Sequence, residues 1–384
     1  MNYFSFMNPA PLRRIGEKKL LAAICLLVFC GMAVAAFWPF NPRPRNHVAW
    51  LGNRNGLRFG GGGIILSSGK LEFPESGMPG GASLEIWLEP AQDTDSTSLL
   101  SFSPPANPLQ LRLRQAQRYL LLLQESTPTI HHSAMTSLWV PRAFQAHKKK
   151  FITISSGMAG TTVYLDGVPV EKSARFRITS KDISGLLILG CSPDGYDTWR
   201  GKLFGMAIFD RKITPAKVSR HYEAWLDGQL AAVSDDHPIG LYTFEERAGN
   251  IVRNQISSRP NLIIPGIFHI PYKPFLKAFW KEFYPNRAYL NDVLINVTGF
   301  VPFGFFFCMY LSSGQTSRKA VVATIVLGAA FSITIEVLQW FIPMRDSGTT
   351  DILTNTLGTA LGAMLYRSGT LHALFDRLAF RTTA

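Results

Sequence analysis

Two segments near the carboxyl end of this 384-residue chain repeat one polar pattern, D-x-x-x-N-x-x-G. Because positions i, i+4 and i+7 lie on one helix face, each segment would present a carboxylate, an amide and a glycine as one stripe. Carboxylates and amides bind polar ligands or join helices by hydrogen bonds, whereas glycine lets a second helix approach closely. The repeated residues are Asp292, Asn296, Gly299, Asp351, Asn355 and Gly358.

More polar side chains lie between these two segments. Glu336 and Gln339 share a face of the intervening apolar stretch, and Arg345 follows it in a short connection. Glu336 would lie about 9 Å inside the end of that stretch. An ionisable group at such depth normally faces protein, water or an opposite charge. We therefore expect Arg345 to be the partner of Glu336.

Two interpretations of this cluster stay open. The polar residues could only join helices, with Asp292 and Asp351 at helix amino termini, where the dipole favours negative charge. Alternatively, so many acidic, amide and basic groups at one membrane face form a ligand site, which we favour. The predicted binding residues are Asp292, Asn296, Glu336, Gln339, Arg345, Asp351 and Asn355. The predicted helix-packing residues are Gly299, Pro302, Gly304, Gly358 and Gly362, and no catalytic residue is assigned.

Four apolar stretches are predicted to cross a membrane and to position these residues. Residues 20–38 contain no charge and would form a helix about 28 Å long, against a hydrocarbon core of about 30 Å. A cleaved signal peptide is the alternative, because Ala33-Val34-Ala35 resembles a cleavage site, but we favour a retained helix. The other helices are predicted at about 291–311, 319–342 and 350–367, and the last is short for a span.

The distribution of basic residues predicts how the helices are oriented. Arg318 and Lys319 lie in the loop around 312–319, and Arg367, Arg377 and Arg381 follow the last stretch. By the positive-inside rule, residues 1–19, this loop and the tail 368–384 are cytoplasmic, and the large central region is outside. Both D-x-x-x-N-x-x-G segments then start at the outer surface, so they are parallel repeats rather than inverted ones.

The segment before the second span is rich in aromatic residues. In residues 269–289, Phe275, Phe279 and Phe283 recur at four-residue spacing among lysines. This pattern predicts a helix that lies at the membrane interface. A buried strap on the outer domain is the alternative, because apolar helix stripes are also common in protein cores.

The central region 45–267 has the pattern of an all-β domain. Short apolar runs are separated by Gly, Pro, Asp and Ser, and helical periodicity is scarce apart from about 215–226. This pattern predicts a two-sheet β-sandwich with a tight hairpin at Asp166-Gly167. The predicted strands are LEIWLE, LQLRLR, YLLLLQ, FITISS, TTVYLDG, LLILG and KLFGMAIF.

The central region contains only weak candidates for catalytic and metal sites. Glu85 and Glu89 share a strand face about 13 Å apart, which is too far for a retaining glycosidase pair. We therefore interpret this strand as non-catalytic, with solvent-facing acids. Two loops could supply oxygen ligands to calcium, although solvation explains them equally well; their residues are Asp93, Asp95, Asp194 and Asp197. The histidines show no zinc-binding spacing, and no other cofactor is predicted.

Composition is consistent with a mixture of membrane and water-soluble parts. Hydrophobic residues make up 47% and charged residues 17%, with a mean hydropathy of +0.10. The net charge is +13, but the basic residues of the central region are interspersed with acids, so nucleic acid is not expected as a partner. Of the four cysteines only Cys191 lies in the central region, which excludes a disulfide scaffold there.

Two family resemblances follow from these motifs. Residues 270–370 resemble the VanZ family, which shares two aspartate-asparagine-glycine helices, a glutamate-glutamine helix and an outer arginine. Residues 45–267 resemble the laminin-G or concanavalin A-like lectin superfamily in the order of GLRFGGGG, SLEIWLEP, VYLDGVPV, LLILGCSPDG and WRGKLFGMAIFDRKITPAKV. The first resemblance implies an integral membrane protein, from a family named for a component of glycopeptide (teicoplanin) resistance. The long outer insert departs from that family, so a resistance role does not simply carry over.

Together these observations predict a multi-pass protein of the bacterial cytoplasmic membrane that acts at the cell envelope. The sandwich would bind a glycan or another surface ligand. The polar cluster would bind an envelope lipid or amphiphile, with Arg345 on an anionic headgroup and Glu336 beside it. An enzyme with Glu336 or Asp351 as general base is a rival, although no nucleophile with its base is visible. A third reading is a membrane anchor for a binding domain.

Overall fold

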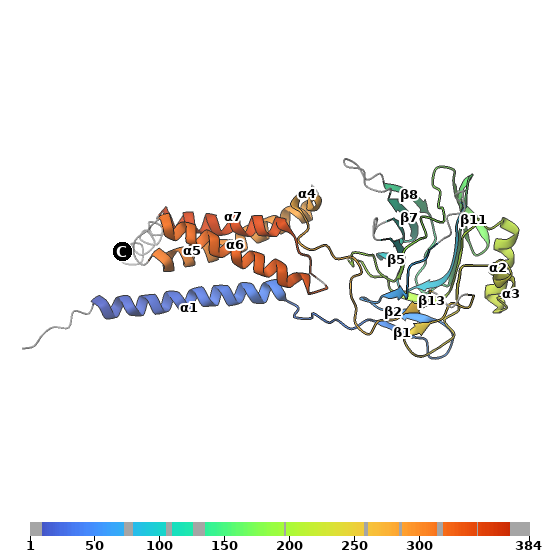
Figure 1. Cartoon of the computed structure of the whole chain (residues 1–384), viewed down its shortest axis with the longest axis horizontal. Helices are drawn as coiled ribbons and strands as arrows, with labels where there is room; N and C mark the ends of the chain where they lie inside the picture. The colour runs from blue at the N-terminus through green and yellow to red at the C-terminus, as the bar shows by residue number, and fades with distance from the viewer. Residues whose placement is uncertain are drawn as a thin grey trace, which may run out of the picture. The chain divides into compact units, whose positions relative to one another are not determined.

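The computed structural model describes residues 10–72, 80–104, 110–125, 135–195, 197–256, 260–283, 286–312, 318–343 and 345–368. The chain forms two compact units (Figure 1). The helical unit comprises Met1–Pro42 and Lys273–Ala384, and the sandwich unit comprises Arg43–Tyr272. Most of the two predicted cytoplasmic tails, including Arg377 and Arg381, lies outside the described residues.

Four long helices build the helical unit. They are α1 Ala10–Phe37, α5 Arg287–Ser312, α6 Arg318–Trp340 and α7 Thr349–Arg367. Figure 1 shows α1 running alongside the other three, and Phe29 of α1 packs on Phe331 of α6 with ring centroids 4.5 Å apart. In the described part of the chain, three segments are long and apolar enough to cross a membrane: Lys18–Phe37, Arg287–Ser312 and Arg318–Trp340. Helix α7 is not among them, so the prediction of four spans is supported for three helices only.

Helices α5 and α7, which carry the repeated motif, run parallel and touch through their backbones. A Cβ atom on Gly358 would lie 2.1 Å from the Val297 carbonyl oxygen, and one on Gly362 would lie 2.1 Å from that of Val301. A Cβ on Gly304 would lie 2.0 Å from the Thr359 carbonyl oxygen. Only glycine permits such an approach, because any side chain would collide with the neighbouring backbone.

Two residues predicted to pack helices do not do so. Gly299 is exposed, and nothing lies within 4 Å of the place where its Cβ would be. Pro302 lies inside α5 and is also exposed. The repeat is therefore not symmetric, because α7 packs on α5 through its motif glycine, whereas α5 packs on α7 through Gly304 instead.

The continuous interfacial helix predicted over 269–289 is wrong in extent. Among the described residues before α5, only Phe279–Glu282 forms a helix, α4, and α5 begins at Arg287. Proline lacks an amide hydrogen and disfavours helix in the residue before it, and Pro271, Pro274 and Pro285 divide this stretch. Its aromatic side chains are nevertheless exposed, with Phe275 at 54% and Trp280 at 68%.

The sandwich unit consists of two antiparallel eight-stranded sheets. The first sheet has the order β1 Val48–Trp50, β2 Leu57–Phe59, β13 Gly201–Phe209, β4 Ser83–Pro90, β9 Lys150–Gly157, β10 Gly160–Leu165 and β11 Val168–Ser173, and β14 Gly240–Tyr242 pairs with β13. The second sheet has the order β15 Ile251–Val252, β16 Leu262–Ile263, β3 Ile65–Ser67, β12 Leu186–Leu189, β5 Ser96–Ser103, β6 Leu111–Ala116, β7 Tyr119–Glu125 and β8 Met135–Val140. The predicted sandwich is confirmed.

Alternating side chains of the two sheets form the core between them. In β6, Leu111 and Leu113 are buried in this core, whereas Arg112 points to the other face, as the period of two requires. The predicted hairpin is also confirmed, because Asp166 and Gly167 join β10 to β11 with φ values of 51° and 79°. All four cysteines are free.

Two helices cover the outer face of the first sheet: α2 Pro215–Asp227 and the short α3 Ala231–Ser234 (Figure 1). Helix α2 begins with Pro215 after Thr214 and ends at Gly228, whose φ of 69° suits glycine. Its apolar side packs a second core against β4, β9 and β13, which includes Phe151, Phe209 and Trp225. Strand β4 is therefore covered on both faces.

Candidate functional site

A buried and a half-buried carboxylate meet at the amino terminus of α7. Oε2 of Glu336, a residue only 1% exposed, accepts the Gly348 amide hydrogen at 2.8 Å. Oε2 of Glu282, from α4, accepts the Thr350 amide at 3.0 Å and the Thr350 hydroxyl at 2.5 Å. A helix amino terminus offers unpaired amide hydrogens and a positive dipole end, which suits both carboxylates. Glu282 also packs directly on Gly348, because a Cβ there would lie 1.9 Å from its Oε1.

Asp351 and the two repeated asparagines link three helices just below this terminus. Asn296 of α5 donates from Nδ2 to Oδ1 of Asp351 on α7 at 2.8 Å. Asn355 of α7 donates from Nδ2 to the Ser332 hydroxyl of α6 at 2.9 Å. Asp292 is exposed and lies beyond the first turn of α5. Equivalent asparagines of the two repeats thus contact different helices.

The predicted pairing of Glu336 with Arg345 is wrong. Arg345 donates from Nη2 to the carbonyl oxygens of Ala35, at 3.3 Å, and Trp38 at the end of α1. Gln339 likewise donates to the Ala36 carbonyl at 2.8 Å. The last carbonyl groups of a helix lack intrahelical partners, so these side chains satisfy the end of α1. The sequence could not indicate this partner, because α1 lies some three hundred residues away.

Lys273, a second cation of the helical unit, also binds backbone carbonyl groups. Lys273 donates from Nζ to the carbonyl oxygens of Gln339, at 3.0 Å, and Ile342, at 2.6 Å, at the end of α6. Burial lowers the pKa of Lys273 to about 8, although the negative charge of Asp346 acts in the opposite direction. This amine is therefore charged in only part of the molecules at mildly alkaline pH.

The structure thus brings most of the predicted site residues to one end of the helical unit, which we call the polar end. It lies where α1 and α6 end and where α5 and α7 begin. Four residues of the polar end were not predicted from the sequence: Glu282, Ser332, Gly348 and Thr350. Gly348-Thr349-Thr350 before the apolar run is a recognisable helix start, whereas nothing in the sequence indicates that Glu282 reaches it.

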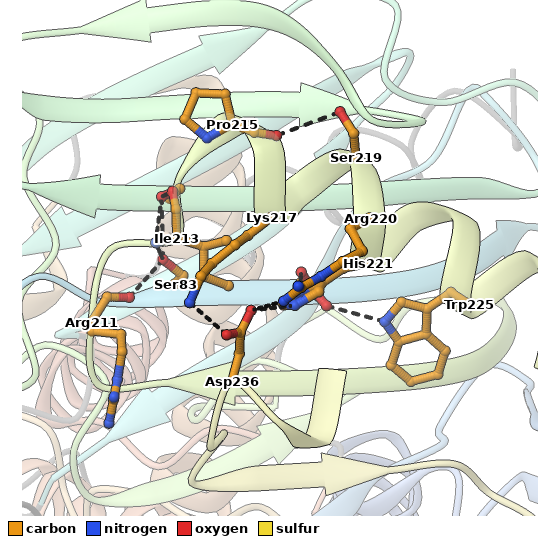
Figure 2. A network of polar contacts seen from close by, with 12 residues as sticks. Ser83, Arg211, Ile213, Pro215, Lys217, Ser219, Arg220, His221, Trp225 and Asp236 are labelled. Atoms are coloured by element: carbon orange, nitrogen blue, oxygen red, sulfur yellow. Dashed lines mark hydrogen bonds and ion pairs between the residues drawn. The ribbon is translucent and has the colours of Figure 1, made fainter. Parts of the chain in front are cut away.

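A polar network in the sandwich unit was also missed. His221 of α2 lies between two carboxylates: Nδ1 is 2.7 Å from Oε1 of Glu85, and Nε2 is 2.8 Å from Oδ2 of Asp236. Trp225 donates to the other oxygen of Glu85 at 3.1 Å, and Lys217 and Arg220 bind Asp236 (Figure 2). His221 and Glu85 are both fully buried.

Glu85 and Glu89 are therefore not solvent-facing, contrary to the sequence prediction. Glu85 lies beneath α2, and Glu89 is 8% exposed with its Oε1 2.5 Å from Nζ of Lys202. The prediction failed because it placed the outer face of β4 in solvent, whereas α2 packs against this face. Glu85 is fully buried, with the His221 imidazole and the Trp225 indole as its partners.

Two of the four loop acids considered for calcium bond to arginine. Oδ2 of Asp93 bonds to Nε of Arg118 at 2.9 Å, and Oδ2 of Asp197 lies 2.5 Å from Nη2 of Arg114. Oδ1 of Asp194 and Oδ1 of Asp197 are buried without a hydrogen-bond partner, so calcium binding stays a prediction. Within the described ranges, no group of three or more His, Cys, Asp or Glu residues could hold a metal.

The sandwich unit also has an open cavity of about 690 Å³. It lies between the segment 68–72 and residues 238, 239, 256, 260 and 261. Its wall combines the Asn261 amide, the Ser68 hydroxyl and the charged Lys70 and Glu72 with the apolar Ile256. Pockets of this size with a few polar groups are typical of small-ligand sites.

Comparison with protein families decides what the two units are. Residues 240–373 match the VanZ/LLP1 family, and residues 62–219 match the Concanavalin A-like lectin/glucanases superfamily. The chain combines a VanZ-like domain with a concanavalin A-like domain. The VanZ-like match begins at residue 240, and therefore includes the last strands of the sandwich. The VanZ-like domain and the three apolar helices indicate a membrane protein.

Solved structures show only distant likeness. A putative carbohydrate binding protein from Bacteroides ovatus is 13% identical with a TM-score of 0.38, over 56% of this chain and 59% of that chain. The heptameric SAP-like pentraxin from Limulus polyphemus is 12% identical with a TM-score of 0.36, over 58% and 95%. The receptor binding domain of botulinum neurotoxin C/D mosaic serotype is 14% identical with a TM-score of 0.37, over 49% and 46%, so less than half of its length is matched. No curated protein matches this chain.

Proposed function

We propose that this protein resides in the bacterial cytoplasmic membrane and binds an envelope amphiphile at the polar end of its VanZ-like domain. The observation that carries the proposal is the convergence of acidic and amide groups from α4, α5, α6 and α7 at that end. Ionisable side chains at membrane depth are costly, and they normally mark a functional site. An anchor alone would not need them.

The basic residues support an outward orientation of the polar end. Arg318 begins α6 and Arg367 ends α7, so both lie at the opposite end of the helices. The positive-inside rule assigns this basic end to the cytoplasm, together with both termini of the chain. The sandwich is connected to the polar ends of α1 and α5, and it is therefore extracytoplasmic.

The exposed aromatic residues before α5 support a position at the membrane surface. Phe275, Phe279, Trp280 and Phe283 are all at least 48% exposed, and Lys277 and Lys281 lie among them. Aromatic and basic side chains of this kind are enriched where headgroups meet acyl chains. A headgroup would thus lie within reach of the polar end.

The sandwich is proposed to bind a glycan of the cell envelope. This rests on its concanavalin A-like family and on the cavity bordered by Ser68 and Asn261, whose hydroxyl and amide suit sugar hydroxyl groups. A glycan array probed with the purified chain tests it. Binding that is lost in Asn261→Leu supports a site in this cavity, whereas unchanged binding places the site elsewhere.

Lipid retention tests the role of the polar end. We expect the purified chain to retain envelope lipid, and Glu336→Gln with Asp351→Asn to reduce the retained amount by about tenfold, as measured by native mass spectrometry. Both substitutions keep the size and a hydrogen-bonding oxygen of the side chain. Equal retention by wild type and the double variant would contradict the proposal. Turnover of the retained lipid that is lost in Glu336→Gln would instead indicate an enzyme.

A link to glycopeptide resistance is proposed from the family resemblance alone. If the polar end binds an amphiphile that such antibiotics also engage, expression of the chain raises the tolerated concentration, and Glu336→Gln abolishes the increase. A growth assay over a teicoplanin series measures both. If wild type and variant give the same tolerance, the polar end has no role in resistance.

A further inference from the structure

The outer face of the second sheet carries an arginine without a partner. Leu111 and Leu113 of β6 are buried in the core, so the residues that alternate with them lie on the outer face. These residues are Arg112 and Arg114. Nη2 of Arg114 lies 2.5 Å from Oδ2 of Asp197, whereas among the described residues no hydrogen bond or ion pair involves Arg112. The outer face thus holds one paired and one unpaired guanidinium group.

Hydrogen-bond donors are in excess around Arg112. Its Nε is buried and has no partner, and the side chain as a whole is half-buried, with terminal nitrogens that are not buried. Ser101 lies directly opposite on β5, is fully buried, and its hydroxyl also has no partner. Buried polar groups without partners are rare in native proteins, and each one calls for an explanation. A negatively charged acceptor that reaches the terminal nitrogens from solvent would supply the missing partner.

Two exposed aromatic rings lie on the same face. The strand register places Leu121 of β7 opposite Arg114 and Trp139 of β8 opposite Leu121, so these three side chains share a face. Tyr119 precedes Leu121 by two residues on β7 and therefore also lies on this face. Trp139 is 51% and Tyr119 44% exposed, with ring centroids 6.0 Å apart and ring planes at 78°. Together they form an open aromatic corner beside the arginines.

The register also sets the spacing between the aromatic corner and the unpaired arginine. Arg112 lies opposite Leu123 of β7, which lies opposite Ser137 of β8, two residues from Trp139. Two strand spacings across the sheet and two residues along it separate the Cα atoms of Arg112 and Trp139 by about 12 Å. One ligand can contact both residues only if it is about two or three sugar rings long. Ser137 is exposed on the same face and offers a hydroxyl group beside this path.

We propose that this outer face binds an acidic glycan, with one sugar ring against Trp139 and the carboxylate of another sugar on Arg112. The negative face of an aromatic ring attracts the polarised C–H groups of a sugar, and a guanidinium group matches a carboxylate with two parallel hydrogen bonds. Both aromatic residues belong to strands rather than to a loop that could insert into a bilayer, which favours a glycan over a lipid surface.

This inference rests on the proposed binding of a glycan by the sandwich, and it adds the chemical class of that glycan. The face shares no residue with the cavity bordered by Ser68 and Asn261. The two sites can therefore be tested separately, by substitutions in one that leave the other intact.

Pairs of oligosaccharides that differ only in their carboxylates test the proposal. The probes are trimers of galacturonate, glucuronate and mannuronate, together with counterparts whose carboxylates are reduced to hydroxymethyl groups. Reduction removes the charge and keeps the sugar rings. We expect at least one acidic trimer to bind the full chain in detergent, and its reduced counterpart to bind about tenfold more weakly by biolayer interferometry.

Three variants separate the contributions to binding. Arg112→Gln should lower the preference for the acidic form to below about twofold, because it removes the charge and keeps most of the length of the side chain. Trp139→Leu should weaken both forms about equally, because stacking does not depend on the carboxylate, so the preference stays. Arg175→Gln is the matched control. Arg175 is an exposed arginine after β11 of the first sheet, so this change removes equal charge and should leave binding unaltered.

Each other outcome overturns the inference in a recognisable way. Equal loss in Arg112→Gln and Arg175→Gln would show a diffuse charge effect. Equal binding of the acidic and reduced trimers would remove the acidic class but leave glycan binding. Loss in Asn261→Leu without loss in Arg112→Gln would place the glycan in the cavity instead. Binding of no trimer would overturn the inference alone if the glycan array is positive, and the proposed glycan binding as well if the array is negative. Retention of anionic lipid that falls in Arg112→Gln, without binding of any trimer, would indicate a membrane-facing surface.

Discussion

His221 is held in one protonation state by two neighbouring carboxylates, those of Glu85 and Asp236. Both ring nitrogens lie within 2.8 Å of a carboxylate oxygen, and ionised carboxylates only accept hydrogen bonds, so the ring must carry both protons. Burial lowers the pKa of His221, but the bonds and charges of Glu85 and Asp236 outweigh this effect, and the net pKa is raised. A buried imidazolium therefore connects α2, the segment after α3, and β4.

This charge state predicts how stability depends on pH. Because the pKa of His221 is raised in the folded chain, its contribution is complete below about pH 6.5 and is lost as the pH rises through the folded value. Hydrogen exchange of α2 peptides in the full chain, corrected for intrinsic rates, should therefore accelerate on the alkaline side. In His221→Leu this pH dependence should disappear. Equal protection of α2 across the alkaline range in the wild type would contradict the imidazolium assignment.

Removing the imidazolium should also destabilise the sandwich. His221→Leu leaves Glu85 with Trp225 as its only bonding partner in the described residues, and an uncompensated buried charge costs about 3–5 kcal/mol. Glu223→Gln on the exposed side of α2 is the control, with a change below about 0.5 kcal/mol. Denaturant unfolding followed by tryptophan fluorescence measures both. Similar values for the two variants would refute the buried charge pair.

Single residues were predictable from sequence only where local spacing decided their role. The positions of Asp351, Asn355 and Glu336 on helix faces followed from intervals of three and four. The partners of the polar residues could not be predicted in this way. Arg345 bonds to α1, and Glu282 binds the start of α7 from a different segment. His221 gave no signal, since a lone histidine on a helix does not reveal which carboxylates the fold brings to it.

Helices α5 and α7 provide a matched pair of substitutions. Gly358→Ala would place a methyl group 2.1 Å from the Val297 carbonyl oxygen, whereas Gly299→Ala would point into open space. We expect the first to cost about 1–3 kcal/mol by overpacking, and the second to be neutral or to stabilise by about 0.5–1 kcal/mol through helix propensity. Thermal unfolding in detergent measures the difference. A melting temperature lowered equally by both would contradict the packing of α5 on α7.

Whole elements were predicted better than single contacts, for a physical reason. Strands such as β4 and β13, and helix α2 between Pro215 and Gly228, carry their own alternation or end signals. The interfacial helix failed because its four-residue aromatic spacing was given more weight than the prolines that interrupt it. Glu85 was misplaced for the opposite reason, since strand alternation says nothing about a helix that covers the outer face of a sheet.

For the molecule as a whole, the orientation in the membrane can be tested by cysteine labelling. In a chain with its four native cysteines replaced by alanine, Asp346→Cys should react with an impermeant maleimide in intact spheroplasts. Arg318→Cys should react only after lysis, because the proposed orientation places the basic end in the cytoplasm. Both positions are exposed, so access rather than burial decides the result. The reverse labelling pattern would place the polar end inside.

Photo-crosslinking shows most directly whether the polar end binds an amphiphile. A lipid with a diazirine in its headgroup is incubated with the full chain, irradiated, and the labelled peptides are mapped by mass spectrometry. We predict labels on 273–283 and 345–355, displaced by excess unlabelled lipid, and a severalfold decrease in the Glu336→Gln, Asp351→Asn variant. Labels confined to the opposite helix ends, or spread evenly along the helices without displacement, would contradict a site at the polar end.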